Sequence, residues 1–164
     1  ELDLLEQEID FLLVDTGAGV GDTVLYFNVA AQERLLVLTP EPTSLTDAYA
    51  LIKVLHLRHG VDRFHVVVNM ATNDREAKEV FARLTGACDH FLQGVSLDFV
   101  GVVPQDIAVR RAVTQQVPVC IHAPESPAAT AVARIAHAMA AWSPQEHADG
   151  NIKFFWKRLL FAGA

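Results

Sequence analysis

Three different chemistries use residues of the kind found between positions 12 and 25, LLVDTGAGVGDTVL. Asp15-Thr16-Gly17 after apolar residues is how aspartic proteases present a catalytic carboxylate. Glycines at 17, 19 and 21 between an expected strand and an expected helix are typical of a dinucleotide-binding loop. An aspartate that ends a buried strand beside mobile glycines also suits Mg²⁺ and γ-phosphate sensing in nucleotide triphosphatases. The rest of the chain has to decide among the three.

The elements that would position this segment alternate along the chain. Apolar runs predict strands at 11–14, 35–38, 64–68 and 99–103, and each run is apolar on both faces, as in parallel strands covered by helices on both sides. Helical periodicity predicts helices at 22–31, 44–58, 74–91, 106–114 and 126–142. This order predicts an α/β fold, a doubly wound, mostly parallel sheet with helices on both faces.

Two of these helices carry finer signals. Thr43 or Ser44 is expected to cap the helix over 44–58, and Pro127 suits the first turn of the last helix. The buried stripe expected on the helix over 44–58 consists of Leu45, Ala48, Leu51, Ile52 and Leu55.

Composition narrows the class of protein. The chain has 164 residues, is 51% hydrophobic and 20% charged, and carries a formal net charge of −7, which favours a folded domain and argues against nonspecific nucleic-acid binding. Its two cysteines form no CxxC pattern, no HExxH is present, and Cys88 and Cys120 are expected to be reduced thiols. No apolar run reaches transmembrane length, and no signal peptide is recognisable.

Context separates the three chemistries. The protease interpretation fails because aspartic proteases pair two aspartates in an all-β fold, whereas helices follow this single DTG. The dinucleotide interpretation is better placed, and Glu41 sits where a ribose-binding acid could lie. Counted from Gly17, however, the third glycine position is Asp22, whose carboxylate would face a pyrophosphate. The magnesium interpretation fits Asp15 with Gly17 and Gly19, and the plainer alternative is that Asp15 only caps the next helix.

Several separated stretches together resemble the MinD/ParA family of deviant P-loop ATPases. FLLVDTGAG is similar to the family's second switch, LLVLTPEPTSLTDAYALIKVL to its next strand and helix, and VVVNM to the strand whose asparagine faces adenine. FVGVVPQDIAVRRAV resembles the segment that closes over the base, and APESPAATAVARIA the final helix. Within that family the likeness is greatest to the flagellar-number regulators of the FlhG, FleN and YlxH class.

The resemblance implies roles for individual residues. Asp15 would position Mg²⁺, through water, and Gly19 would be the switch glycine. Asn69 would hydrogen-bond the adenine edge, with Pro104 and Asp106 completing the base pocket. Asn69 also fits a strand-end turn residue and Asp106 a helix N-cap, and the roles can coexist.

The resemblance also implies an activity and partners. The complete protein would bind ATP and Mg²⁺, dimerise on ATP, and act as a membrane-localisation switch that controls flagellar number or placement. Its expected location is cytoplasmic, reversibly at the inner membrane. Its partners would be a second copy, the flagellar GTPase FlhF, switch-complex proteins or a flagellar transcription activator, and no direct nucleic-acid contact is expected.

The departures from the family pattern matter as well. The sequence contains no G-K-G-G-x-G-K-T phosphate loop and no first switch, so this chain alone is expected to hydrolyse nothing, and the family's first strand and phosphate loop would precede Glu1. Two further functions therefore stay open. One is another positioning ATPase of the family, for partition or division, and the other is a membrane-associated interaction module without enzymatic activity.

The C-terminal stretch NIKFFWKRLLFAG is the second informative segment. On a helix, the residues Ile152, Phe155, Trp156, Leu159 and Leu160 would share one apolar face, and Lys153, Lys157 and Arg158 would lie away from it. This pattern favours a helix lying in an anionic membrane interface, although it also suits a helix that docks on its own domain. We therefore expect an ATPase-like part at 1–142, a polar linker at 143–150 and a membrane-targeting helix at 151–164.

Overall fold

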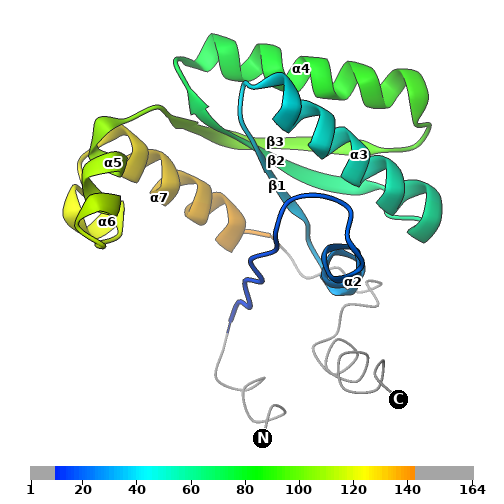
Figure 1. The fold of residues 1–164 in the computed structure, drawn as a ribbon, viewed down its shortest axis with the longest axis horizontal. Helices are drawn as coiled ribbons and strands as arrows, with labels where there is room; N and C mark the ends of the chain where they lie inside the picture. Colours follow the sequence, from blue (N-terminus) through cyan, green and yellow to red (C-terminus); the bar gives the residue numbers. More distant parts are fainter. Residues whose placement is uncertain (1–9, 143–164) are drawn as a thin grey trace, which may run out of the picture.

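The computed structural model describes residues 10–142, and it forms a three-layer α/β unit (Figure 1). The sheet consists of β1 (Leu35–Leu38), β2 (Arg63–Ala71) and β3 (Ser96–Pro104). The helices are α2 (Asp22–Ala30), α3 (Pro42–His59), α4 (Asp74–Phe91), α5 (Ile107–Thr114), α6 (Val119–His122) and α7 (Pro127–Ala140). Helices α3 and α4 cover one face of the sheet and α7 lies on the other, which confirms the predicted fold class.

The three strands are parallel and follow one another in the order β1-β2-β3. Leu36 is paired with Val66, and Val66 with Phe99. A bulge follows in β3, because the next residue of β2, Val67, is paired with Gly101. The carboxyl ends of all three strands therefore lie at the same edge of the sheet, which is where ligands bind in open parallel sheets.

The core lies between the sheet and the α3/α4 layer. Phe64, Val66 and Val68 of β2 are fully buried there, together with Ile52 and Leu55 of α3. The remaining members of the predicted α3 stripe, Leu45, Ala48 and Leu51, are partly buried and pack against the same cluster. Each fully buried side chain of this size contributes about 1.5–3 kcal/mol relative to its exposed state.

The opposite face of the sheet is only partly covered. Helix α7 packs on β3, where Gly101 leaves room for Ile135: a Cβ at residue 101 would lie 3.0 Å from Ile135 Cγ1. Val37 of β1 is 60% exposed, because α7 does not extend over β1. This face is thus apolar but open along β1.

The strand expected at 11–14 does not form, and that prediction is wrong. Residues 10–16 have no regular structure, and Phe11 and Leu13 are 57% and 76% exposed. A strand needs a hydrogen-bonded neighbour, and among the described residues β1 is paired only with β2. The apolar pattern alone therefore does not make this segment a strand.

The expected cap of the second helix is also wrong. Helix α3 begins with Pro42 at its first position after Glu41, and no side chain caps it. Ser44 Oγ instead accepts a hydrogen bond from the backbone N–H of Thr39, 3.0 Å away, and so ties the helix to the end of β1. The proline, whose missing N–H costs nothing in the first turn, explains the earlier start.

Candidate functional site

Asn69 and Pro104 lie at the carboxyl edge of the sheet, as the resemblance implies. Asn69 of β2 is paired with Val103 of β3, and Ala71 with Pro104, across a second irregularity in the ladder. The backbone N–H of Gln105 donates to the Ala71 carbonyl at 2.9 Å and holds the two strand ends together beyond the sheet. The fold therefore brings two of the predicted base-pocket residues into one place.

The amide of Asn69 is oriented by an unusual backbone. Met70 has a φ of 59°, in the left-handed region that non-glycine residues seldom adopt, and this costs about 1–3 kcal/mol. In this conformation the Met70 N–H donates to Asn69 Oδ1 at 2.9 Å. The side chain is thus pinned by its own neighbour at a strand end, where such local strain commonly serves a binding site.

Asp106 joins two helix starts. Its Oδ1 accepts from the Ala108 N–H at 2.8 Å and its Oδ2 from the Ala128 N–H at 3.1 Å, so one carboxylate caps α5 and holds the first turn of α7. These hydrogen bonds, the one from Ala108 first, lower the pKa of Asp106 below its usual value. Asp106 therefore has the predicted capping role. To contact a nucleotide as well, its carboxylate would have to use the lone pairs that these hydrogen bonds leave free.

Asp15 and Gly19 are not hydrogen-bonded to these residues in the part of the chain that the structure describes. Both are in the irregular segment before α2, where Asp15 is exposed and Gly19 has a φ of 98°, a conformation that favours glycine. No side chain caps α2, so Asp15 does not have the plain capping role. Among the described residues, no hydrogen bond or ion pair connects Asp15 or Gly19 with Asn69, Pro104 or Asp106.

The described residues do not form a complete metal centre. No group of three or more His, Cys, Asp and Glu side chains within 10–142 could hold a metal ion. Asp15 supplies a single exposed carboxylate, which fits contact with hydrated Mg²⁺ and is too little to bind the ion alone, since Mg²⁺ demands near-octahedral oxygen coordination. Phosphate oxygens and further donors would have to complete the shell.

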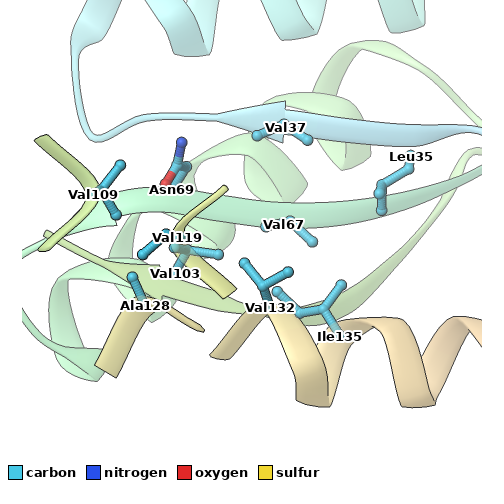
Figure 2. A pocket seen from close by; sticks show the side chains of 10 residues that line it. All are labelled: Leu35, Val37, Val67, Asn69, Val103, Val109, Val119, Ala128, Val132 and Ile135. Carbon is cyan, nitrogen blue, oxygen red and sulfur yellow. The ribbon is translucent and has the colours of Figure 1, made fainter. Parts of the chain in front are cut away.

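An apolar groove of about 310 Å³ runs from Asn69 along the open face of the sheet (Figure 2). Valines and other aliphatic side chains of the sheet, α5, α6 and α7 line it, and Asn69 is its polar member. Its lining consists of Leu35, Val37, Val67, Asn69, Val103, Val109, Val119, Ala128, Val132 and Ile135. The sequence patterns place the apolar members in strands and helices but do not reveal that part of their surface stays uncovered.

The predicted membrane-targeting residues 151–164 and the linker 143–150 lie outside the described part of the chain. Within 10–142, no helix combines the length and the apolar character that crossing a bilayer requires. The two cysteines are free, with Cys88 buried and Cys120 exposed, in agreement with the expected reduced thiols.

The chain matches known proteins along most of its length. The family model ParA, described as NUBPL iron-transfer P-loop NTPase, matches residues 3–140. The antiactivator FleN of Pseudomonas aeruginosa is 46% identical over 95% of this chain and 55% of its own length. The flagellum site-determining protein YlxH of Helicobacter pylori is 28% identical over 93% of this chain and 52% of its own.

A solved structure shares the fold. The MinD cell division protein of Aquifex aeolicus superposes with a TM-score of 0.61 over 87% of this chain and 58% of its own, at 21% identity. The chain thus spans about half the length of the curated relatives that it matches.

Proposed function

This chain belongs to the ParA family of P-loop NTPases, and we propose that it is part of an ATP-dependent switch that controls flagellar number or placement. The observation that carries the proposal is the 46% identity to FleN over 95% of the chain. The chain is also similar to YlxH, which is described as a flagellum site-determining protein. The activity, substrates and partners of the complete protein are part of the proposal.

The proposed nucleotide site has two parts. Asn69 and Pro104, with Asp106 beside them, form the base-binding part at the carboxyl edge of β2 and β3, and the register of these strands supports this. Asp15 contacts the hydration shell of Mg²⁺, and Gly19 gives the turn that senses the γ-phosphate. Mg²⁺, when bound, neutralises charge on the phosphates. The residues of this chain orient the base and the ion.

The proposed output is a change of location. ATP binding promotes dimerisation, and the basic amphipathic helix at 151–164 then binds the anionic inner surface of the cell membrane, with 143–150 as its linker. Each of Lys153, Lys157 and Arg158 adds about 1 kcal/mol near such a surface. FlhF, switch-complex proteins or a flagellar transcription activator read out the location.

A chimera tests the function directly. The matching part of Pseudomonas aeruginosa FleN is replaced by this chain, and the chimera is introduced into cells that lack FleN. We expect it to restore normal flagellar number, because the exchanged parts are 46% identical in sequence. Asp15→Ala is expected to abolish rescue, and Asp22→Ala, an exposed acid in the first turn of α2, serves as the matched control. Failure of a well-expressed chimera, or full rescue by Asp15→Ala, would contradict the proposal.

The base-binding part has its own test in the same chimera. Asn69→Ala is expected to weaken ATP binding by about 5-fold to 150-fold, because one directed hydrogen bond to a buried polar partner is worth about 1–3 kcal/mol. The matched control is Gln105→Ala, an exposed amide just past β3. Equal ATP affinity of the Asn69 variant and the control would remove Asn69 from the site.

Another positioning ATPase of the family is the alternative function. The septum site-determining protein MinD of Bacillus subtilis is 27% identical over 80% of this chain, which supports the family and leaves the positioned object open. Flagellar number and division-site position measured in the same chimeric cells distinguish the two.

A further inference from the structure

A buried histidine lies on the open face of the sheet. His65 of β2 is 4% exposed, and it is the one buried polar side chain among the described residues. A buried polar group is costly unless it is paired, and His65 Nε2 lies 2.9 Å from Glu33 Oε2. The other ring nitrogen lies 3.8 Å from Asp98 Oδ2. Asp98 in turn accepts a 3.0 Å hydrogen bond from Arg63 Nε.

The ring of His65 is covered by Trp142. The two rings are stacked with centroids 3.9 Å apart and planes 17° from parallel. Trp142 follows shortly after the end of α7, and its backbone N–H donates to the Met139 carbonyl at 3.0 Å. This tryptophan is therefore fixed to the fold at the position directly before residues 143–164.

Glu33 connects this stack to α2. It lies in the loop between α2 and β1, next to Arg34. The Arg34 guanidinium donates to the Asn28 carbonyl at 2.7 Å and to the Ala31 carbonyl at 2.6 Å, and so holds the C-terminal end of α2. Helix α2 begins directly after the segment that contains Asp15 and Gly19.

We propose that Glu33, His65 and Trp142 form a clasp that holds the root of the C-terminal segment against the sheet, and that displacement of α2 opens it. The inference rests on the proposed function for the role that residues 143–164 have after their release. The continuous contacts run from the loop after α2, through Glu33 and the His65 ring, to Trp142. The clasp makes the start of the C-terminal segment responsive to the glycine-containing segment before α2.

Hydrogen exchange of the Trp142 amide in the intact chain tests the clasp. Arg34→Met releases the end of α2, and we expect it to speed exchange at Trp142 by between about 2-fold and 100-fold, the range of coupling between residues in contact. The core amide of Val66, fully buried in the middle of β2, is the internal reference. His137→Ala, an exposed histidine on α7, is the matched control and is expected to change neither amide.

The coupling is isolated by His65→Phe, which keeps a flat ring against Trp142 and loses the bond to Glu33. In this background Arg34→Met is expected to have no effect on Trp142. An equal acceleration by Arg34→Met in the wild-type and His65→Phe backgrounds, or no acceleration in the wild-type background, overturns the proposal. If Arg34→Met exposes Val66 as well, the milder Arg34→Lys, which loses the forked contacts to the Asn28 and Ala31 carbonyls, replaces it and the same comparison decides.

Binding to vesicles with anionic lipid separates this inference from the proposed function. We expect Arg34→Met to raise the share of chain that co-sediments with the vesicles, and His65→Phe to remove the sensitivity to residue 34. Coupled exchange without any vesicle binding supports the clasp and contradicts the membrane function. If the chain binds vesicles to the same extent with and without both substitutions, and Arg34→Met does not change hydrogen exchange at Trp142, only the clasp is contradicted.

Discussion

Replacing Gly101 with alanine tests how closely α7 packs on β3. The added Cβ would lie 3.0 Å from Ile135 Cγ1 and 3.5 Å from its Cδ1, so the Ile135 side chain has to move by a few tenths of an ångström. Overpacking of this kind costs about 1–3 kcal/mol. Alanine also restricts the unfolded chain, which returns about 0.4–1 kcal/mol. We expect a net loss of about 1 kcal/mol in the free energy of unfolding.

A double-mutant cycle with Ile135→Ala checks the cause. Truncation of Ile135 costs about 2 kcal/mol, near the lower end for such changes, because this side chain borders the open groove. It also removes both atoms that an alanine Cβ at 101 would meet. In that background Gly101→Ala is expected to be neutral or stabilising, a coupling of about 1–2 kcal/mol. Urea unfolding followed by circular dichroism measures all four proteins, and an equal cost of Gly101→Ala in both backgrounds would refute the reasoning.

Three further outcomes are expected. Hydrogen bonds from the N–H groups of Ala108 and Ala128 lower the pKa of Asp106, so the stability that its carboxylate contributes is present above the unfolded-state pKa and is lost as the pH falls through the lower folded-state pKa. In Asp106→Asn, the free energy of unfolding should therefore depend less on pH below about pH 4. Burial, with a smaller effect of Asp89, raises the pKa of the Cys88 thiol to about 11. A thiol reagent at about pH 8 should therefore label the exposed Cys120 rapidly and Cys88 only after denaturation, which mass spectrometry of the peptides can check. Asn73→Ala removes the Oδ1 that accepts from the Glu76 N–H at the start of α4 and should cost about 1 kcal/mol in urea unfolding, whereas no loss would show that the cap is dispensable.

Local sequence patterns were sufficient to predict several helices and strands. The strand at 35–38 and the helix at 74–91 appear with the predicted bounds, because uniform apolar character and a clear 3.6-residue period leave little ambiguity. The α/β layers were predictable for the same reason. The placement of Asn69 and Pro104 together was implied by the family resemblance, and the parallel strands bring both to one edge of the sheet.

Features that depend on distant partners were not predictable. The apolar run at 11–14 looks like any other strand, and only the lack of a paired neighbour among the described residues distinguishes it. The stacking of His65 on Trp142 joins residues far apart in the sequence, and no local spacing indicates it. The left-handed backbone of Met70 was also hidden, because methionine has no preference for that conformation.

The short strand β1 has a practical consequence for work in solution. Among the described residues it is hydrogen-bonded to β2 alone, so within residues 10–142 it is an edge strand. A strand edge of this kind is a template onto which another chain can add, and its length of four residues gives it limited reach. A dilution series of this chain therefore checks whether it self-associates through β1, and affinities are best compared in the concentration range where it does not.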